Sequence, residues 1–209
     1  RRLLGERVKV LSRRLVKLKQ QRETGRQRRV EIPIPSVALV GYTNAGKSTF
    51  LNAISDAGVI VQDQLFATLD PTTRRVNLPN GHVALFTDTV GFIQKLPTAL
   101  VASFRSTLEE INEADLLVHV VDISHANADE QVAAVEEVLE ELGAGDKPVI
   151  TALNKVDLLD GDDDAAQARL THAMQSYPNP VQMSALRGQG VIDLLEAVAS
   201  KLRQSMVPV

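Results

Sequence analysis

Hydrophobic residues near the start of the chain follow a helical repeat. They recur at alternating spacings of four and three, at Leu4, Val8, Leu11, Leu15 and Leu18. This spacing places them on one stripe of a helix whose other faces carry many Arg and Lys residues. We therefore predict a basic amphipathic helix over residues 1–23, similar to one strand of a coiled coil. Its basic face fits either a solvated surface beside a neighbour or a contact with nucleic acid.

The helical pattern stops after residue 23. Pro33 and Pro35 favour extended backbone, so residues 24–36 are predicted to be a linker. Over residues 37–209, short apolar runs alternate with helical patterns, which is typical of a parallel α/β sheet. The predicted strands are Val37–Val40, Arg74–Leu78, His82–Asp88, Leu116–Asp122, Val149–Leu153 and Val181–Met183.

Helices are predicted between these strands. One follows Gly46, and the others are Ala99–Glu113, Asp129–Leu142, Ala165–Ser176 and Val191–Arg203. Asn80-Gly81 separates two strand patterns and favours a tight hairpin turn, which makes the strand at 74–78 antiparallel to its neighbour. The predicted fold is α/β, with a six-stranded, mixed but mostly parallel sheet wrapped by five helices.

Composition and charge narrow the kind of protein. The 209 residues include no cysteine, which excludes disulfides and thiolate metal sites and fits a reducing compartment such as the cytoplasm. The apolar runs are shorter than the roughly 20 residues that a membrane helix needs. The net charge of −3 combines +9 for residues 1–36 with −12 for residues 37–209. The acidity of the second part disfavours casual binding to nucleic acid.

A complete phosphate-binding pattern, G-x-x-x-x-G-K-S, directly follows the first predicted strand and opens a helix. It comprises Gly41, Tyr42, Thr43, Asn44, Ala45, Gly46, Lys47 and Ser48, and Thr49 comes next. In such loops, backbone N–H groups converge on phosphates and the helix N-terminus adds a positive dipole. We expect Lys47 to bridge the terminal phosphates as a catalytic residue and the Ser48 hydroxyl to bind Mg²⁺.

A second motif bears on the choice of base. Asn154-Lys155-Val156-Asp157 lies at the end of the fifth predicted strand, where open α/β sheets bind ligands. The Asp157 carboxylate can accept hydrogen bonds from the ring N–H and the exocyclic amine of guanine, a donor pair that adenine lacks. We expect Asn154 to hold the loop and contact the base edge, and the Lys155 stem to cover the face of the base. The phosphate loop alone leaves ATPase, kinase and GTPase open, and this motif favours a GTPase.

Two further strand ends complete the predicted site. Asp88-Thr89-Val90-Gly91 can hold Mg²⁺ through water with its carboxylate and reach a γ-phosphate with the Gly91 N–H. Ser184-Ala185, after the last predicted strand, can offer a backbone N–H to the guanine oxygen. In this order the motifs predict a GTP-binding domain of the P-loop NTPase class over residues 37–209.

Two segments between the motifs are predicted to be switch loops. Residues 63–75 are rich in Thr and lack apolar periodicity. Within them, Thr68 is our choice as a ligand of Mg²⁺ and the γ-phosphate, ahead of Thr72 and Thr73. Residues 91–98 form the second predicted switch. We expect the γ-phosphate to order both segments and its hydrolysis to release them.

Three runs of sequence are similar to the HflX family of translational GTPases: Gly41 to Thr49, Asp63 to Arg74, and Asp88 to Pro97 leading to residues 104–109. Within the second run, Phe66 is also assigned to the nucleotide site. The resemblance implies binding to the large ribosomal subunit and, as in members studied, help in separating stalled or idle ribosomes. It also implies that residues 3–29 are the tail of a two-helix connector that follows an N-terminal domain. Because residue 1 is Arg, we expect a piece of a longer protein, and we expect it to be a monomer.

Hydrolysis is expected to be slow without a partner. Many regulatory GTPases have a glutamine directly after the D-x-x-G motif to orient the attacking water, and here that position is Phe92. An apolar side chain cannot orient water, so another residue or a partner must do so, with Gln94 and Arg105 as candidates. Asn44 occupies the position that helps bind K⁺ in potassium-activated GTPases, which makes potassium stimulation a further hypothesis.

Other polar residues carry weaker signals. The four histidines show no ligand spacing. Residues 160–164 imitate the start of a calcium loop, but Ala165 stands where glycine is required, which favours a solvated, helix-capping acidic loop. A second function remains open beside the ribosomal switch: a nucleotide-sensing ribosome-assembly or rRNA-binding module in which hydrolysis only resets binding.

Overall fold

The structure is a computed structural model that describes residues 34–55, 72–89, 91, 110–159 and 163–206. The chain divides into two compact units, Arg1–Ile34 and Pro35–Val209, and the described strands and helices belong to the second. The helix predicted over residues 1–23 and most of the linker predicted after it lie outside the described residues. So do residues 63–71 of the first predicted switch and all of the second except Gly91.

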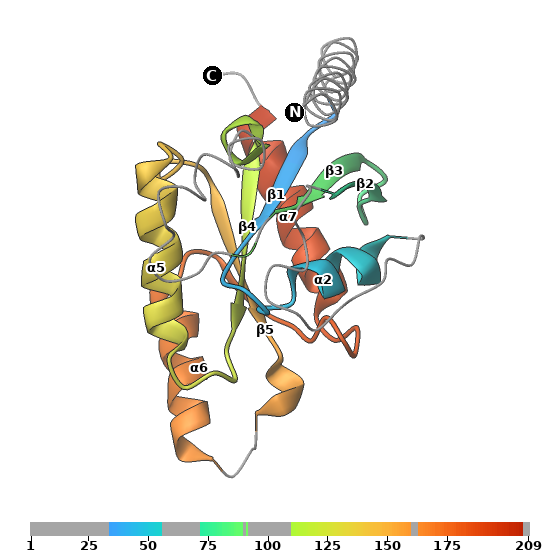
Figure 1. Ribbon diagram of the computed structural model, residues 1–209. Helices are drawn as coiled ribbons and strands as arrows, with labels where there is room; N and C mark the ends of the chain where they lie inside the picture. Colours follow the sequence, from blue (N-terminus) through green and yellow to red (C-terminus); the bar gives the residue numbers. More distant parts are fainter. Residues whose placement is uncertain (1–33, 56–71, 90, 92–109, 160–162, 207–209) are drawn as a thin grey trace, which may run out of the picture. The chain divides into compact units, whose positions relative to one another are not determined.

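Six strands form one sheet in the order β2-β3-β1-β4-β5-β6 (Figure 1). Every pair of neighbours is parallel except β2 and β3, which confirms the predicted six-stranded mixed sheet. The central strands are nearly continuous apolar runs because helices bury them on both faces. The strand bounds are β1 Ser36–Val40, β2 Thr72–Asn77, β3 Val83–Asp88, β4 Leu116–Asp122, β5 Val149–Asn154 and β6 Pro180–Gln182.

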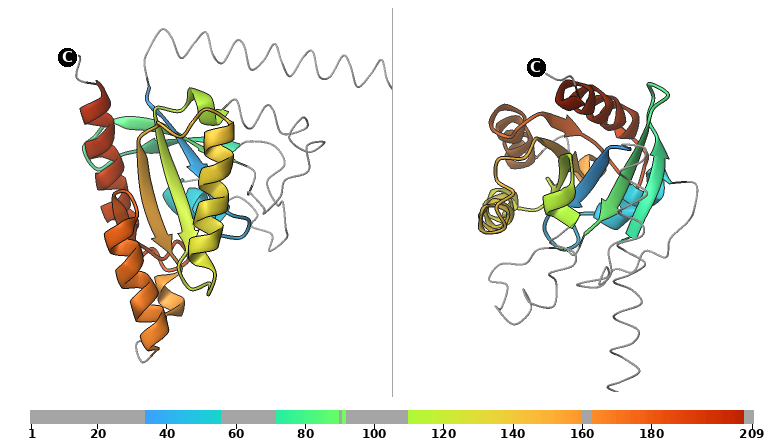
Figure 2. Two further views of the ribbon diagram at one scale, coloured as in Figure 1. Left: turned by 90° about the vertical axis from the view of Figure 1, so that its left-hand side faces the viewer. Right: turned by 90° about the horizontal axis from the view of Figure 1, so that it is seen from above.

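Helices lie on both sides of the sheet, as Figure 2 shows for α5 and α7. On one face, α2 and α7 contribute side chains such as Phe50 and Leu194 to the largest apolar cluster. On the other face, α5 and α6 pack through Val132 and Ala173 against Val121 of β4. The bounds are α2 Lys47–Ile54, α5 Ala128–Glu141, α6 Asp164–Ser176 and α7 Val191–Met206, with a short 3-10 helix η1 at Val156–Leu158.

The hairpin between β2 and β3 corrects one predicted boundary. The predicted strand at 74–78 instead begins at Thr72 and ends at Asn77, and Leu78 belongs to the turn. Gly81 donates to the Leu78 carbonyl at 2.9 Å and has a φ of +80°, which suits glycine. Leu78 is nevertheless buried, because its side chain packs into the core from the turn. Its apolar character therefore looked like the end of a strand.

The helix boundaries agree with the sequence to within a few residues. Helix α6 begins at Asp164, and the Asp163 carboxylate accepts a hydrogen bond from the Ala165 N–H at 2.9 Å. This bond confirms a helix-capping role for the acidic loop at Asp163. Of the helix predicted at 99–113, residues 110–113 are described, and they are helical. Within the described part of the chain, no helix combines the length and apolar character needed to cross a membrane.

Candidate functional site

The loop after β1 is shaped by two glycines that cannot carry a side chain. Gly41 has a φ of +148°, and a Cβ there would lie 2.3 Å from the Val120 carbonyl oxygen on β4. Gly46 has a φ of +101°, and its Cβ would lie 2.2 Å from the Asn154 Nδ2 atom. Gly46 is also the residue from which α2 starts. The loop therefore lies directly against the ends of β4 and β5, with the positive end of a helix at its last residue.

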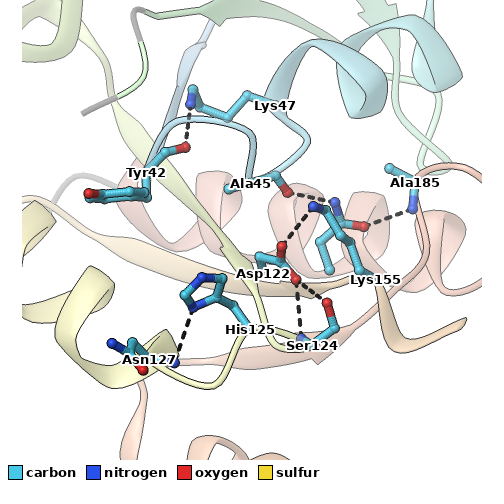
Figure 3. A network of polar contacts seen from close by, with 10 residues as sticks. Tyr42, Ala45, Lys47, Asp122, Ser124, His125, Asn127, Lys155 and Ala185 are labelled. Atoms are coloured by element: carbon cyan, nitrogen blue, oxygen red, sulfur yellow. Dashed lines mark hydrogen bonds and ion pairs between the residues drawn. The ribbon is translucent and has the colours of Figure 1, made fainter. Parts of the chain in front are cut away.

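Lys47 is the first residue of α2, and its side chain folds back over the loop. The Nζ atom donates to the Gly41 carbonyl oxygen at 3.0 Å. It also donates to the Tyr42 carbonyl oxygen at 3.0 Å (Figure 3). Only 6% of the residue is exposed. Burial lowers the Lys47 pKa from 10.5 to about 8, and the negative charge of Asp88 partly opposes this change. A buried ammonium group that its own loop holds is well placed to meet phosphate oxygens.

The Asp88 motif meets the start of α2 from the end of β3. The Asp88 Oδ2 atom accepts a hydrogen bond from the Ser48 hydroxyl at 2.5 Å. Next to it, the buried Thr89 hydroxyl donates to the Leu39 carbonyl oxygen at 2.6 Å and thereby ties the motif to β1. Hydroxyl and carboxylate oxygens are the hard ligands that Mg²⁺ prefers. Ser48 and Asp88 therefore form a donor pair that fits a magnesium ion.

Gly91 lies against the phosphate-binding loop. A Cβ on Gly91 would stand 2.8 Å from the Thr43 Cα atom and 3.2 Å from the Lys47 Nζ atom. Of these contacts, the one with Thr43 involves backbone, so a larger residue at 91 would push the two segments apart. The structure thus brings the end of the Asp88 motif beside Lys47, as expected if both contact one phosphate group.

Asn154 joins three segments of the site. Its Nδ2 atom donates to the Ala45 carbonyl oxygen at 2.8 Å, and its Oδ1 atom accepts from the Ala185 N–H at 2.9 Å. Both hydrogen bonds are buried. The predicted role of holding the loop therefore has a geometric basis, because the side-chain amide links the phosphate-binding loop to the Ser184-Ala185 loop. The Ala185 N–H, predicted for the guanine oxygen, is engaged in this link.

Lys155 follows Asn154 directly and caps the start of η1, and Asp157 lies within η1. Lys155 has a φ of +66°, and its Nζ atom forms an ion pair with the Asp122 Oδ2 atom at 2.7 Å. The Asp157 side chain is 13% exposed, and its Oδ2 atom lies 3.9 Å from the Arg187 Nε atom. This carboxylate therefore lies close to the loop after β6, which is where a guanine edge is predicted.

The loop after β6 is held by its own backbone. Ser184 is fully buried, its N–H donates to the Gln189 carbonyl oxygen at 2.9 Å, and its hydroxyl accepts from the Arg187 N–H at 3.1 Å. Gly190 has a φ of +68°, and a Cβ there would be 2.1 Å from the Gln182 carbonyl oxygen. These contacts bend the loop back onto β6 and place Ala185 beside Asn154.

The structure brings most of the predicted site together at one edge of the sheet. The motifs at 41–49, 88–91, 154–157 and 184–185 meet there, apart from Val90, which lies outside the described residues. The other predicted residues outside that part of the chain are Phe66, Thr68, Phe92, Gln94 and Arg105. The two alternatives to Thr68 are both in β2, where the Thr73 hydroxyl hydrogen bonds to the Thr87 hydroxyl at 2.9 Å.

Two residues near the site were given no role from the sequence. Asp122 was predicted only as the last residue of a strand, yet it contacts Lys155. His119 lies in β4, and burial, with a smaller effect of the Lys47 charge, lowers its pKa from 6.5 to about 4. Among the described residues, no group of three or more His, Cys, Asp or Glu side chains could hold a metal. The signal that could have found Asp122 is its place at the same sheet edge as Asp88 and Asn154.

The fold and these motifs define a phosphate-loop nucleotide-binding domain. A family model described as "50S ribosome-binding GTPase" matches residues 36–155, more than half of the chain. Alignments to curated relatives narrow the assignment further. The chain belongs to the HflX family of GTPases.

The relatives support this assignment over almost the whole chain. The GTPase HflX of Lacrimispora saccharolytica is 46% identical over 207 residues, which are 99% of this chain and 47% of that protein. The GTPase HflX of Escherichia coli is 44% identical over 202 residues, 97% of this chain and 46% of that protein. The chain therefore spans about half the length of the curated relatives it matches.

A solved structure gives the same fold with a nucleotide. It is a GTP-binding protein from Sulfolobus solfataricus in complex with GDP, with a TM-score of 0.66 and 27% sequence identity. The match covers 96% of this chain and 60% of that protein. A similar fold therefore occurs in a protein that was crystallised with GDP.

Proposed function

We propose that this chain binds GTP and hydrolyses it to GDP and phosphate. The observation that carries the proposal is a pair of buried hydrogen bonds at Asn154, which donates to the Ala45 carbonyl oxygen and accepts from the Ala185 N–H. They link the phosphate-binding loop to the loop proposed to bind the base, so that the two are held in one arrangement. A phosphate site without base selection would need no such link.

In this proposal the phosphates lie on the loop at 41–48 and the base lies between the two later motifs. Lys47 and the loop N–H groups bind the phosphates, and Lys47 and Gly91 stabilise the negative charge that develops during transfer. Asp157 accepts two hydrogen bonds from guanine, and the Ser184-Ala185 loop borders the base site. Thr68 and Phe66 complete the site from the first switch.

Magnesium would be held by Ser48 and Asp88, and by Thr68 when GTP is bound. The contact of 2.5 Å between the Ser48 hydroxyl and the Asp88 carboxylate supports this choice, because the two oxygens already converge. When bound, the ion neutralises charge on the terminal phosphates. The chain's own contribution is to orient these oxygens through α2 and β3.

Hydrolysis by the chain alone should be slow, because Phe92 follows the Asp88 motif where a water-orienting side chain would stand. A partner that supplies the missing group can accelerate such reactions by about 10³–10⁵-fold. Gln94 and Arg105 are the candidates within the chain. Replacing each by alanine should lower the rate only if that residue positions water.

The proposed partner is the large ribosomal subunit, with its rRNA and proteins, and the proposed location is the cytoplasm. The family description and the HflX relatives support this partner. We propose that GTP loading switches the chain, a monomer, into a form that binds the subunit and, in the longer protein with its N-terminal domain, promotes ribosome splitting. In the alternative, GTP loading alone sets affinity for rRNA and hydrolysis only resets it.

Single-turnover GTP hydrolysis, with and without purified large subunits, tests the proposal. We expect a low rate without subunits and a large increase with them. If the chain binds subunits in a GTP-dependent manner but its hydrolysis rate is unchanged, the alternative, in which GTP loading alone sets affinity for rRNA, is favoured. The absence of both GTP binding and hydrolysis would contradict the proposal as a whole.

A monovalent cation is a further part of the proposal. Asn44 has a φ of +59° within the phosphate-binding loop, a conformation that Asn tolerates better than most residues. We propose that its side chain helps bind K⁺ near the phosphates. Hydrolysis should then be faster in potassium than in sodium buffer, and Asn44→Ala should remove the difference. Equal rates in both buffers would exclude this role.

A further inference from the structure

Asp122 is fixed at the same sheet edge as the Asn154 motif. It ends β4, and its register partner on β5 is Asn154. The Ile123 N–H donates to the Asn154 carbonyl oxygen at 3.1 Å, so the pairing of the two strands continues one residue beyond Asp122. The backbone of Asp122 is therefore held at a defined distance from the start of the base-binding turn.

Both carboxylate oxygens of Asp122 are engaged, each in a different direction. The Oδ1 atom accepts from the Ser124 N–H at 3.1 Å and from the Ser124 hydroxyl at 2.6 Å. The Oδ2 atom accepts from the Lys155 Nζ atom at 2.7 Å (Figure 3). Ser124 thus orients the carboxylate, and the carboxylate holds the ammonium group of Lys155.

The environment makes this ion pair stronger than a typical surface pair. The exposed fraction of the Asp122 side chain is 14%, and that of the Lys155 side chain is 30%. Partial burial reduces screening by solvent, and a charged donor with a charged acceptor gives a short, strong hydrogen bond. A lysine side chain without such a partner keeps several rotamers, whereas this one has a fixed end.

We propose that Asp122 is a positioning residue for the nucleotide base. Asp122 holds the Lys155 ammonium group, so both ends of the methylene stem of Lys155 are fixed. The stem then forms one wall of the base site. The inference rests on the proposed binding of guanine nucleotides. It adds a residue that contacts neither base nor phosphate and acts through Lys155.

This role differs from that of Asp157 in a measurable way. A methylene stem covers the flat face of a base and does not read its edge, so its contribution is the same for any purine base that enters. Asp157 recognises the exocyclic amine, which hypoxanthine lacks. Removing the Asp122 carboxylate should therefore weaken GDP and IDP by the same factor and leave their ratio unchanged.

The test is equilibrium binding of GDP, IDP and inorganic pyrophosphate to wild type and Asp122→Ala. For Asp122→Ala we expect GDP and IDP each to bind more weakly by on the order of tenfold, as for loss of a hydrogen bond to a charged group. Pyrophosphate, which has no base, should bind with unchanged affinity. Weaker binding of pyrophosphate by the same factor would mean general disruption of the site and would overturn the inference.

A double-mutant cycle with Lys155→Met separates positioning from a merely structural role. Methionine keeps an unbranched apolar side chain but has no charge for Asp122 to hold. In the Lys155→Met background, Asp122→Ala should change GDP affinity by less than about twofold, because its effect runs through the missing ammonium group. An unchanged tenfold effect in that background would show that Asp122 acts through the strand end itself.

The matched control is Asp146→Asn, together with Asp122→Asn. Asp146 is an exposed carboxylate before the start of β5, at the opposite end of that strand from the site, so its neutralisation should not change affinity. Asp122→Asn keeps an acceptor oxygen and should give a loss smaller than that of Asp122→Ala. If wild type fails to bind GDP, the proposed function is wrong. If wild type binds and Asp122→Ala binds equally well, only this inference is wrong.

Discussion

The side chain of Asn154 donates to the carbonyl oxygen of Ala45 at 2.8 Å, although the two residues are 109 positions apart in the chain. The bond is buried, and Ala45 directly precedes Gly46, the N-cap residue of α2. Because the oxygen of the same amide accepts a hydrogen bond from the Ala185 N–H, one residue links the phosphate-binding loop to the loop that is proposed to bind the base. This link is the structural basis of the proposed nucleotide site.

Replacing Asn154 by alanine should therefore affect both stability and binding. The substitution leaves the Ala45 carbonyl and the Ala185 N–H without their partner in a buried position, which should lower the free energy of unfolding by about 2–3 kcal/mol. GDP affinity should fall as well, because the two loops lose their common support. Urea denaturation and calorimetric titration with GDP measure the two effects.

Asn127→Ala is the matched control for this variant. The Asn127 side chain donates to the Glu130 carboxylate at 3.1 Å on the exposed surface at the start of α5. Its loss should cost about 0.5 kcal/mol or less and leave GDP affinity unchanged. Equal losses of stability in the two variants would contradict the role assigned to Asn154.

Two glycines in the loop after β6 offer a matched pair. Gly188 and Gly190 have φ values of +74° and +68°, so alanine is strained to a similar degree at both. A Cβ at 188 meets nothing within 4 Å, whereas one at 190 would lie 2.1 Å from the Gln182 carbonyl oxygen. We expect Gly188→Ala to cost about 1 kcal/mol from backbone strain alone.

Gly190→Ala should cost more than about 3 kcal/mol, because the loop must also move away from β6. That movement carries Ala185 with it, so the variant should lose GDP affinity while Gly188→Ala keeps it. Thermal unfolding and GDP titration of both variants check this. Similar stabilities would mean that the loop does not depend on its close approach to Gln182.

The effect of Mg²⁺ on nucleotide binding should require the hydroxyl of Ser48. In wild type, Mg²⁺ should strengthen binding of a non-hydrolysable GTP analogue relative to binding in EDTA. Ser48→Ala removes one ligand, so the gain from Mg²⁺ should shrink by on the order of 10-fold or more. Binding of GDP in EDTA should remain close to that of wild type. A full Mg²⁺ effect in Ser48→Ala would remove Ser48 from the metal site.

The sequence predicted the shape of the phosphate-binding loop, because the pattern that encodes it is local. The run from Gly41 to Ser48 has its glycines, lysine and hydroxyl at fixed offsets, and a strand and a helix flank it, so the shape of the loop follows from neighbours in sequence. That Asn154 and Ser184-Ala185 lie near this loop could also be predicted from the sequence. Parallel strands bring their carboxyl ends to one edge, so residues that follow different strands meet in space.

Other features depend on contacts that no local pattern encodes. Leu78 was predicted as a strand residue because it is apolar, and the structure instead packs it into the core from a turn. Asp122 has its partner 33 positions away, and a single acidic residue at a strand end is a common feature. The pairing with Lys155 arises from the sheet register, which only the folded chain defines.

His119 is a second residue whose state depends on the fold. Its position on β4 interrupts an apolar run, and its register partners are Val40 and Thr151, both buried. Burial, together with the charge of Lys47, holds its pKa at about 4. His119 is therefore neutral in the folded chain throughout the physiological pH range.

This buried histidine predicts a dependence of stability on pH. Below pH 6.5 the unfolded chain takes up a proton at His119, and the folded chain does so only near pH 4. Stability should thus decrease as the pH falls from 6.5 to 4, by on the order of 3 kcal/mol for this group. Compared with wild type, His119→Gln should show a shallower loss of stability over this range in urea denaturation. Parallel curves for the two proteins would contradict the assignment.

Base selection by Asp157 is the most direct test of the proposed GTP site. The carboxylate can accept from both donors of guanine, whereas an asparagine would accept from the ring N–H and donate to the O2 atom of xanthine. The measurement is competition of GDP, ADP and XDP against labelled GDP for wild type, and against labelled XDP for Asp157→Asn. We predict that wild type prefers GDP strongly over both ADP and XDP, and that Asp157→Asn prefers XDP. Equal competition by ADP and GDP in wild type would contradict the account.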